Sequence, residues 1–254
     1  MDRAPVWAPD DPPVAQNGRM SSADVAPNPR WELAEELADA VRRRWAADVQ
    51  AIGVHGSLAH GDDTLGSDID LVVVTYGDGR GPHPGSRRID GIIVDLGVIS
   101  ADAYLRHART LSTTWPLAAD QYLTTTPLHD PGGWFDTLRD THLARLAEAS
   151  GREFSALARA AWYEAMSLHA RSSRLAQRYD TDGAVLLIAQ ARIAAATVEG
   201  LLTRTYFRGA AEAVTRTGLG EMTGTEVGAK LQAQAEALAE RGRPVDGDIA
   251  DLLS

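Results

Sequence analysis

Cysteine is absent from this chain of 254 residues, which excludes a disulfide framework and a zinc site built from thiolates. A long apolar run is also missing, since no stretch approaches the roughly 20 residues that a membrane-spanning helix needs. The N-terminus does not combine a basic segment with a following apolar segment, as a secretory signal does. These absences predict a cytoplasmic protein with no membrane partner.

Positive charge is scarce relative to negative charge. Lysine and arginine together number 25 against 35 aspartate and glutamate residues, and the formal net charge is −10 at pH 7. Nucleic-acid binding depends on clustered lysine and arginine, so we expect no nucleic-acid partner and disfavour extension of RNA or DNA. An acidic cleft would instead attract a small polycationic substrate.

The remaining composition, 44% hydrophobic and 24% charged, is ordinary for a globular protein. Residues 1–28 are rich in proline, aspartate and alanine, which predicts a disordered leader. Residues 29–130 are rich in strand patterns and residues 131–254 are rich in helical periodicity, so we predict an α+β fold of two domains. It would consist of a mixed β-sheet domain with flanking helices, followed by a C-terminal helical bundle domain. We expect strands at 49–54, 68–76, 87–89 and 91–99, and helices at 31–45, after the cap Ser100, and at 134–149, 152–178, 183–207 and 225–241.

A pair of aspartates opens the second predicted strand. Side chains alternate faces along a strand, so Asp68 and Asp70 point the same way, roughly 7 Å apart, while Ile69 points toward a core. Two carboxylates on one face favour a hard divalent cation between them. Magnesium also leaves coordination positions for phosphate oxygens, so the pair predicts a nucleotide-phosphate site.

The turn before this pair supports the same interpretation. Gly56 allows the backbone to bend and a ligand to approach closely, and the hydroxyl of Ser57 would hold terminal phosphates. A Gly-Ser pair alone is usually a turn, and an Asp-x-Asp alone is usually a solvated strand end. The two together, ten residues apart and followed by an unbroken apolar strand, favour the functional interpretation.

Two further acids are candidates for the site. Asp95 interrupts the apolar segment 92–98, where a carboxylate is costly without a partner; we expect it to face Asp68 and Asp70, the alternative being a strand edge exposed to water. Glu164 lies at the edge of an apolar stripe in the predicted helix 152–178. Partial shielding by apolar neighbours would suit it to act as a general base, and the alternative is an ordinary flanking glutamate.

This pattern of Gly-Ser followed by Asp-x-Asp resembles the nucleotidyltransferase superfamily that includes DNA polymerase β. Segments beyond the metal motif resemble one group in that superfamily, the aminoglycoside 4'-O-nucleotidyltransferases such as kanamycin nucleotidyltransferase. The similarity is carried by residues 52–58, 67–70, 94–95, the Trp-Pro-Leu segment at 115–117 and the segment 127–133.

The resemblance implies roles for particular residues. Magnesium would be bound by Asp68, Asp70 and Asp95, with Asp95 completing the catalytic site, and the nucleotide by Gly56, Ser57, Ser67 and His60. Glu164 would take the proton of the acceptor hydroxyl. The group forms homodimers with active sites between subunits, so Glu164 would act on nucleotide held by the partner.

Several cations of that group are missing here. Leu168 and Ile93 stand where the group has basic residues, and a histidine, His60, stands at a third such position. His169 or Arg171 could substitute for the first of them.

The expected reaction is transfer of AMP from Mg-ATP to an aminoglycoside hydroxyl, with release of pyrophosphate. Acids such as Asp120 and Glu199 are candidates for holding the ammonium groups of the acceptor. Three alternatives stay open: a lincosamide-like drug or antibiotic-pathway intermediate as acceptor, a protein hydroxyl as acceptor, or a homologue that binds nucleotide or antibiotic without catalysis.

Overall fold

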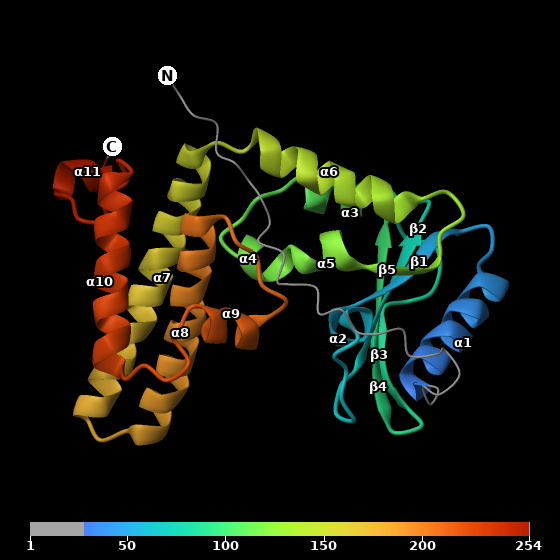
Figure 1. Ribbon diagram of the computed structural model, residues 1–254, viewed down its shortest axis with the longest axis horizontal. Helices are drawn as coiled ribbons and strands as arrows, with labels where there is room; N and C mark the ends of the chain where they lie inside the picture. Colours follow the sequence, from blue (N-terminus) through green and yellow to red (C-terminus); the bar gives the residue numbers. More distant parts are fainter. Residues whose placement is uncertain (1–27, 254) are drawn as a thin grey trace, which may run out of the picture.

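The computed structural model of the protein describes residues 28–253. The predicted leader falls almost wholly outside these described residues. Within them, a sheet with its flanking helices occupies one side of the molecule and a set of long helices occupies the other (Figure 1). We call the strands β1–β5 together with α1 (Pro29–Arg44), α2 (Gly56–His60) and α3 (Ala101–Ala108) the sheet region. The helices from α7 (Gly151–Gln177) to α10 (Gly224–Glu240) form the helical region. This arrangement confirms the predicted α+β fold class.

The sheet has five strands in the order β3-β4-β2-β1-β5. It is mixed, because β2 and β4 run parallel while the β1–β2, β1–β5 and β3–β4 pairs are antiparallel. A short edge strand, β5, was not expected from the sequence, where residues 126–129 suggested only the approach to a turn. Its proline at 127 is tolerated because β5 has a single neighbour, β1. The strands are β1 (Val49–His55), β2 (Ile69–Thr75), β3 (Gly85–Ile89), β4 (Ile92–Ser100) and β5 (Thr126–His129).

Helices cover both faces of the sheet. On one face α1 (Pro29–Arg44) packs through Ala34, Ala38 and Val41, and on the other face α3 (Ala101–Ala108) and α6 (Trp134–Glu148) pack over the alternate strand residues. The predicted cap is confirmed, since the Ser100 hydroxyl accepts a hydrogen bond from the backbone N–H at position 103, 3.4 Å away. The central strands are therefore buried on both sides.

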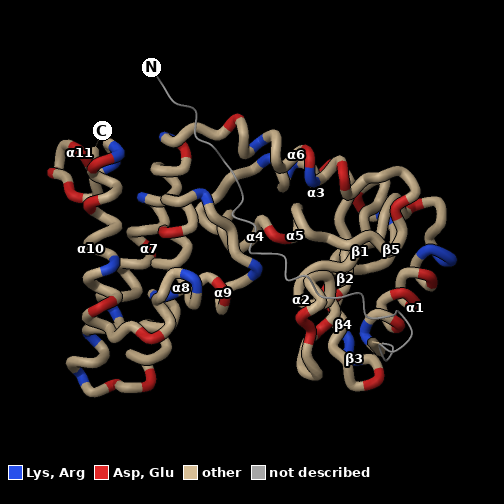
Figure 2. Tube along the Cα trace, in the orientation of Figure 1, with Lys and Arg blue, Asp and Glu red and all other residues tan. Residues whose placement is uncertain are grey.

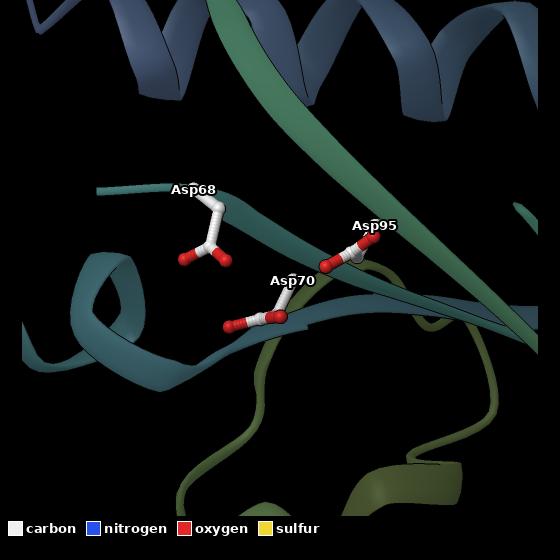
Figure 3. A group of neighbouring side chains, drawn as sticks. All are labelled: Asp68, Asp70 and Asp95. Atoms are coloured by element: carbon white, nitrogen blue, oxygen red, sulfur yellow. The ribbon is translucent and has the colours of Figure 1, made fainter. Parts of the chain in front are cut away.

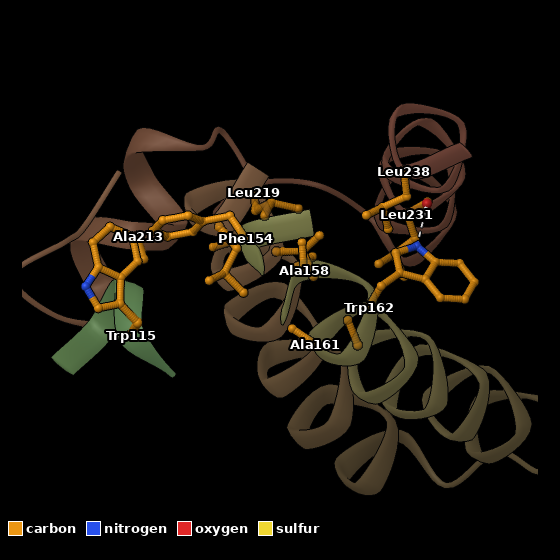
Figure 4. Packing of buried hydrophobic residues seen from close by; sticks show 14 of the residues in the cluster. Trp115, Phe154, Ala158, Ala161, Trp162, Ala213, Leu219, Leu231 and Leu238 are labelled. Atoms are coloured by element: carbon orange, nitrogen blue, oxygen red, sulfur yellow. Dashed lines mark hydrogen bonds between the residues drawn. The ribbon is translucent and has the colours of Figure 1, made fainter. Parts of the chain in front are cut away.

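The helical region consists of α7 (Gly151–Gln177), α8 (Thr181–Thr203), α9 (Ala210–Arg216) and α10 (Gly224–Glu240), and the short α11 (Ile249–Leu253) follows it. Small alanine side chains let α7 and α8 approach closely, and the core between the helices also contains large aromatic residues (Figure 4). The indole N–H of Trp162 on α7 donates to the carbonyl of Leu231 on α10 at 2.8 Å. This bond fixes α10 against the first helix of the region.

The helix expected over 183–207 ends earlier than predicted. Arg204 adopts a left-handed φ of 54° and its backbone N–H bonds the carbonyl of Gly200, which terminates α8 at Thr203. The chain then turns into α9, which the sequence had not revealed. The other predicted helices are confirmed with shifts of one or two residues.

The connection between the two regions is built from short elements, α4 (Trp115–Ala118) and α5 (Asp120–Thr124). Trp115 belongs to the core of the helical region, while its indole N–H donates to His142 on α6 at 3.1 Å. Helix α6 contacts both cores, the sheet core through residues such as Phe135 and the helical core through Leu146. The domain division near residue 130 stays a prediction.

Among the described residues, α8 is one helix long and apolar enough to cross a membrane by length and composition alone. Its buried face, including Ala191, Ala195 and Leu201, forms part of the helical core against α7. This packing is that of a core helix.

Candidate active site

Three carboxylates meet at the start of β2. Asp68 precedes the strand, Asp70 is its second residue, and Asp95 stands directly beside Asp70 in the parallel ladder between β2 and β4. Oxygen atoms from the three side chains all lie within 4.8 Å of one another (Figure 3). The predicted convergence of the three acids is therefore present in the fold.

The alternation of β2 produces this arrangement. Ile69 and Leu71 are buried in the core beneath α1, so the intervening Asp70 projects from the opposite face, where Asp95 also projects. Because β2 and β4 are parallel neighbours, residues in register stand side by side rather than diagonally. A shift of one residue in either strand would separate the two carboxylates.

Two residues that the sequence had not singled out extend this row across the sheet. Ser86 on β3 is the register partner of Asp95 and its hydroxyl donates a hydrogen bond to Oδ1 of that carboxylate. His55, the last residue of β1, is the register partner of Asp70. Ser86, Asp95, Asp70 and His55 therefore occupy one row over four adjacent strands.

The carboxylates of this row repel one another and are partly buried. Burial raises the pKa of Asp70, the carboxylates of Asp68 and Asp95 raise it further, and only His55 opposes them. Burial lowers the pKa of His55, while Asp70, Asp120 and Asp68 act in the opposite direction. A cation among the three carboxylates would relieve this repulsion.

The donor set fits magnesium. Hard carboxylate oxygens are the ligands that Mg²⁺ takes, and two oxygens on one octahedral ion lie about 3–4 Å apart. The 4.8 Å limit on the three side chains is close to that span, so small rotamer changes would bring all three onto one ion or onto a pair of ions. Asp68, Asp70 and Asp95 are thus the residues that would hold the metal.

The Gly-Ser turn lies against the acid row. Gly56 begins the short helix α2 (Gly56–His60) with a left-handed φ of 70°, and a Cβ atom at this position would lie 2.5 Å from Oδ2 of Asp70. Glycine is therefore required twice, by the backbone conformation and by the adjacent carboxylate. Ser57 follows Gly56 directly in α2 and is half-buried.

The loop before β2 is held by its own polar contacts and by α1. The Ser67 hydroxyl accepts from the backbone N–H of Thr64 at 2.9 Å, so this predicted nucleotide-binding residue also shapes the turn. Arg30 on α1 is buried, and it donates to the backbone carbonyls of Ser67 at 3.0 Å and Leu65 at 2.5 Å. Arg30 was not predicted from the sequence, and it positions the segment from which Asp68 emerges.

His60, a predicted nucleotide-binding residue at the end of α2, makes an internal contact. Its Nε2 lies 3.0 Å and 3.1 Å from the two carboxylate oxygens of Asp120 on α5. The pair is largely buried, with side-chain exposures of 14% and 9%. Asp120, a candidate for acceptor binding, is therefore already paired in the free protein, as is Glu199, whose carboxylate lies 3.0 Å from Lys230 Nζ.

Glu164 does not join the acid row within one chain. It lies on α7, in the part of the molecule away from β2 and β4 (Figure 1), and it is exposed. The expected shielding by apolar neighbours is absent in the isolated chain, because Glu164 faces solvent while Ala161 and Ala165 fill the core. Its role as general base stays a prediction that needs a second subunit.

A pocket of about 370 Å³ opens beside the acids. Its walls come from the sheet face and from α3 and α5, and they combine polar, aromatic and aliphatic residues. The hydroxyl of Tyr104 donates to Gln121 Oε1 at 3.3 Å across one side of it. The lining includes His55, Asp70, Asp95, Tyr104, Gln121 and Tyr122.

Comparison with known proteins agrees with this geometry. Residues 34–110 match the family described as a nucleotidyltransferase domain. The matched range contains most of α1, the strand β1, the Gly-Ser turn and all three acids. The chain therefore contains a nucleotidyltransferase domain of the DNA polymerase β type, for which a nucleoside triphosphate is the implied substrate.

Individual proteins and one solved structure are also similar to this chain. Two proteins named aminoglycoside nucleotidyltransferase (4'), from Staphylococcus aureus and from a Bacillus species, are each 26% identical to this chain over 113 residues. The match covers 44% of this chain and 44% of each relative. A crystal structure of a nucleotidyltransferase-like protein from Exiguobacterium sibiricum is 14% identical, with a TM-score of 0.43 over 82% of this chain and 75% of that one.

Proposed function

We propose that this protein transfers AMP from Mg-ATP to a hydroxyl of an aminoglycoside, of the 4' type, and releases pyrophosphate. The observation that supports the proposal most is the row of carboxylates at Asp68, Asp70 and Asp95 beside the Gly56 turn, inside a matched nucleotidyltransferase domain. The acceptor class is supported by the two relatives that carry that name.

The residues of the site divide the task. Asp68, Asp70 and Asp95 would hold Mg²⁺, which when bound neutralises phosphate charge and orients the α-phosphate. Ser57 would hold the terminal phosphates so that pyrophosphate leaves in line with the incoming oxygen. The acceptor oxygen forms a bond to the α-phosphorus, the bond to pyrophosphate breaks, and the hydroxyl proton passes to a general base.

We assign the general base to Glu164 of a second copy of the chain. Within one chain α7 is too remote from β2, so a homodimer is required for Glu164 to reach the acceptor. Near Glu164 in the sequence of α7, Tyr163 is 44% and Met166 39% exposed, and α8 exposes Val185 and Leu186 at 61% each. Such side chains suit burial against another subunit.

The acceptor would bind in the pocket next to the acids. Ammonium groups of an aminoglycoside are attracted by the excess of carboxylates, which are distributed over both regions (Figure 2). Asp120 could accept such an ammonium group in exchange for His60, since α5, which carries it, also lines the pocket through Gln121 and Tyr122. Half-buried Tyr122 lines the pocket and offers an aromatic ring against which a sugar can pack.

The test is incubation of the full chain with Mg-ATP and a panel of aminoglycosides, followed by mass spectrometry of the products. The proposal predicts that at least one drug gains the mass of one AMP, with stoichiometric pyrophosphate. The Asp70→Asn variant serves as the matched control, since it keeps the size of the side chain and removes a metal ligand. Pyrophosphate release without a drug product would contradict the aminoglycoside assignment and direct the search to other acceptors. Binding of ATP with no pyrophosphate release under any condition would contradict the enzymatic function.

A further inference from the structure

The segment between α8 and α9 links the helical region to the Gly-Ser turn. The backbone N–H of Phe207 donates to the carbonyl of Pro116 at 2.7 Å, which fixes the segment against α4. The next residue, Arg208, extends to the sheet region, where its Nη1 lies 2.8 Å from Oδ2 of Asp62. These partners are 146 residues apart in the chain, so the fold brings this guanidinium to the turn.

Asp62 is part of the structure that closes α2. Its backbone N–H donates to the carbonyl of Ser57 at 3.2 Å, just after Gly61 ends the helix with a left-handed conformation. Asp62 is therefore bonded through its backbone to Ser57, the residue expected to hold the terminal phosphates. Through its ion pair with Asp62, the guanidinium of Arg208 is held at the turn that carries Ser57.

The loop that follows α2 has an excess of negative charge, which favours a nearby cation. His60, at the end of α2, is engaged by Asp120, and the loop that follows carries Asp62 and Asp63. In Figure 2 basic residues occur on the stretch that leads into α9, and acidic residues occur beside α2. Tyr206 lies near both groups: burial raises its pKa most, Asp120 raises it further, and Arg208 acts against them. Arg208 thus stands in the same electrostatic environment as the His60–Asp120 pair.

The ion pair with Asp62 is easily exchanged. Its two side chains are 50% and 54% exposed, and exposed pairs of this kind contribute little to stability. A triphosphate would offer Arg208 a more highly charged partner, and the planar guanidinium matches phosphate oxygens with two parallel hydrogen bonds.

We propose that Arg208 is a binding residue for the terminal phosphates of the nucleoside triphosphate, held by Asp62 in the free protein and transferred to phosphate when the nucleotide binds. The proposal rests on the proposed function and adds a phosphate-binding residue from the helical region. Asp62 is then a competitor of the nucleotide for the same guanidinium, not a contributor to its binding.

The two partners therefore give opposite effects. Affinity for the magnesium complex of a non-hydrolysable ATP analogue would be measured by isothermal titration calorimetry on the full chain, with thermal unfolding as a check on folding. Arg208→Ala is expected to weaken binding roughly 10- to 100-fold, because a charge-assisted hydrogen bond is lost. Asp62→Asn is expected to tighten binding about two- to tenfold, because the competing carboxylate is removed.

Arg216→Ala is the matched control. Arg216 lies on α9 with 51% exposure and pairs with Glu212 nearby, so its loss removes the same charge from the same neighbourhood without touching Asp62. We expect its affinity to stay within about twofold of the parent protein, since the Arg216 guanidinium pairs with Glu212 and not with Asp62, and an exposed charge is screened. Arg208→Gln provides a second variant that keeps part of the aliphatic stem and a polar end group if Arg208→Ala does not fold.

The outcomes separate this inference from the function on which it rests. If the parent protein binds no magnesium–nucleotide complex, the proposed function itself is contradicted. If the parent binds and Arg208→Ala and Arg208→Gln bind equally well, the role of Arg208 is wrong. A weakening by Asp62→Asn equal to that of Arg208→Ala would identify the pair as a structural fastener and overturn the inference, as would an equal loss in Arg216→Ala.

Discussion

Asp70 and Asp95 stand opposite each other in the parallel ladder between β2 and β4, so two carboxylates from chain positions 25 apart share one face of the sheet. Asp68 completes the group within 4.8 Å, and burial together with these neighbours raises the pKa of Asp70. Such a cluster costs stability in the free protein and gains its advantage only with a cation bound. The cluster of three carboxylates is therefore the strongest indication that this is a functional site.

Replacing Asp70 by Asn should separate activity from stability. Nucleotidyl transfer is expected to fall at least about 100-fold, because the metal and its phosphates lose a ligand. The free energy of unfolding should stay the same or rise by up to about 1 kcal/mol, since one of three repelling charges is removed. Steady-state kinetics and urea unfolding without added metal would measure the two quantities.

Magnesium provides the complementary check on that variant. Added Mg²⁺ should raise the melting temperature of the parent protein by mass action and raise that of Asp70→Asn less. Equal shifts in both proteins would show that the ion binds elsewhere.

Gly56 and Gly61 offer a matched pair at the two ends of α2. Both have a φ of 70°, but a Cβ at Gly56 would lie 2.5 Å from Asp70 Oδ2, whereas a Cβ at Gly61 would meet nothing within 4 Å. Each alanine variant should lose about 1–2 kcal/mol of stability from the left-handed backbone. Only Gly56→Ala should also displace Asp70 and abolish most transfer activity. Similar kcat/KM values for the two variants would contradict the close approach of the turn to the acids.

The homodimer can be tested by mixing inactive variants. If Glu164 serves the nucleotide of the partner, a heterodimer of Asp70→Asn and Glu164→Gln has one site with both defects and one intact site. Subunit exchange should then restore about a quarter of the parent activity, since half of randomly assembled dimers are heterodimers with one working site each. Activity would be measured before and after exchange, and each variant alone should stay inactive. No recovery despite demonstrated exchange would place the base in the same chain or elsewhere.

Stability should depend on pH through His142, which is fully buried between the two regions. Its Nδ1–H donates to the carbonyl of Ala108 at 2.7 Å, and its Nε2 accepts from the indole N–H of Trp115 at 3.1 Å. A second proton on Nε2 would face the Trp115 donor, and burial lowers the pKa of His142 below its usual 6.5, although the Ala108 carbonyl opposes this. The unfolded state therefore takes up the proton first as pH falls.

The contribution of His142 to the free energy of unfolding should therefore be fully present above about pH 6.5. Below that pH it should decline by at most about 1.4 kcal/mol per pH unit, until the lowered pKa of His142 in the folded protein is reached. Denaturant unfolding between pH 7.5 and 5 would measure the slope. His142→Gln should be less stable at pH 7.5 and show a shallower decline. An unchanged slope in the variant would assign the acid sensitivity to other groups.

The sequence was informative where the pattern was local. The local sequence at 68–74 predicts a strand on which Asp68 and Asp70 share one face and Ile69 points to the other. Asp95 is recognisable because a charged residue interrupts an apolar strand. The cap at Ser100 and the long helices follow from equally local signals. Three acids on two strands could therefore be predicted to meet.

Residues whose role depends on register were not predictable. His55 and Ser86 enter the row only because β1 pairs with β2 and β3 with β4 at particular registers, which no local pattern determines. In the sequence, Arg30 is an ordinary polar residue near a helix start, and its role depends on hydrogen bonds to the distant loop at 65–67. Arg204 ended α8 against its helical pattern, through a left-handed conformation that sequence does not signal for arginine.

The most direct test of the account follows the phosphorus atoms. The full chain would be incubated with Mg²⁺, an aminoglycoside, and ATP labelled either at the α- or at the γ-phosphate, beside the Asp70→Asn variant. The account predicts that the α label moves to the drug, that the γ label appears in pyrophosphate, and that Asp70→Asn transfers neither. A γ label on the drug, or α transfer at the parent rate in Asp70→Asn, would contradict nucleotidyl transfer at these three acids.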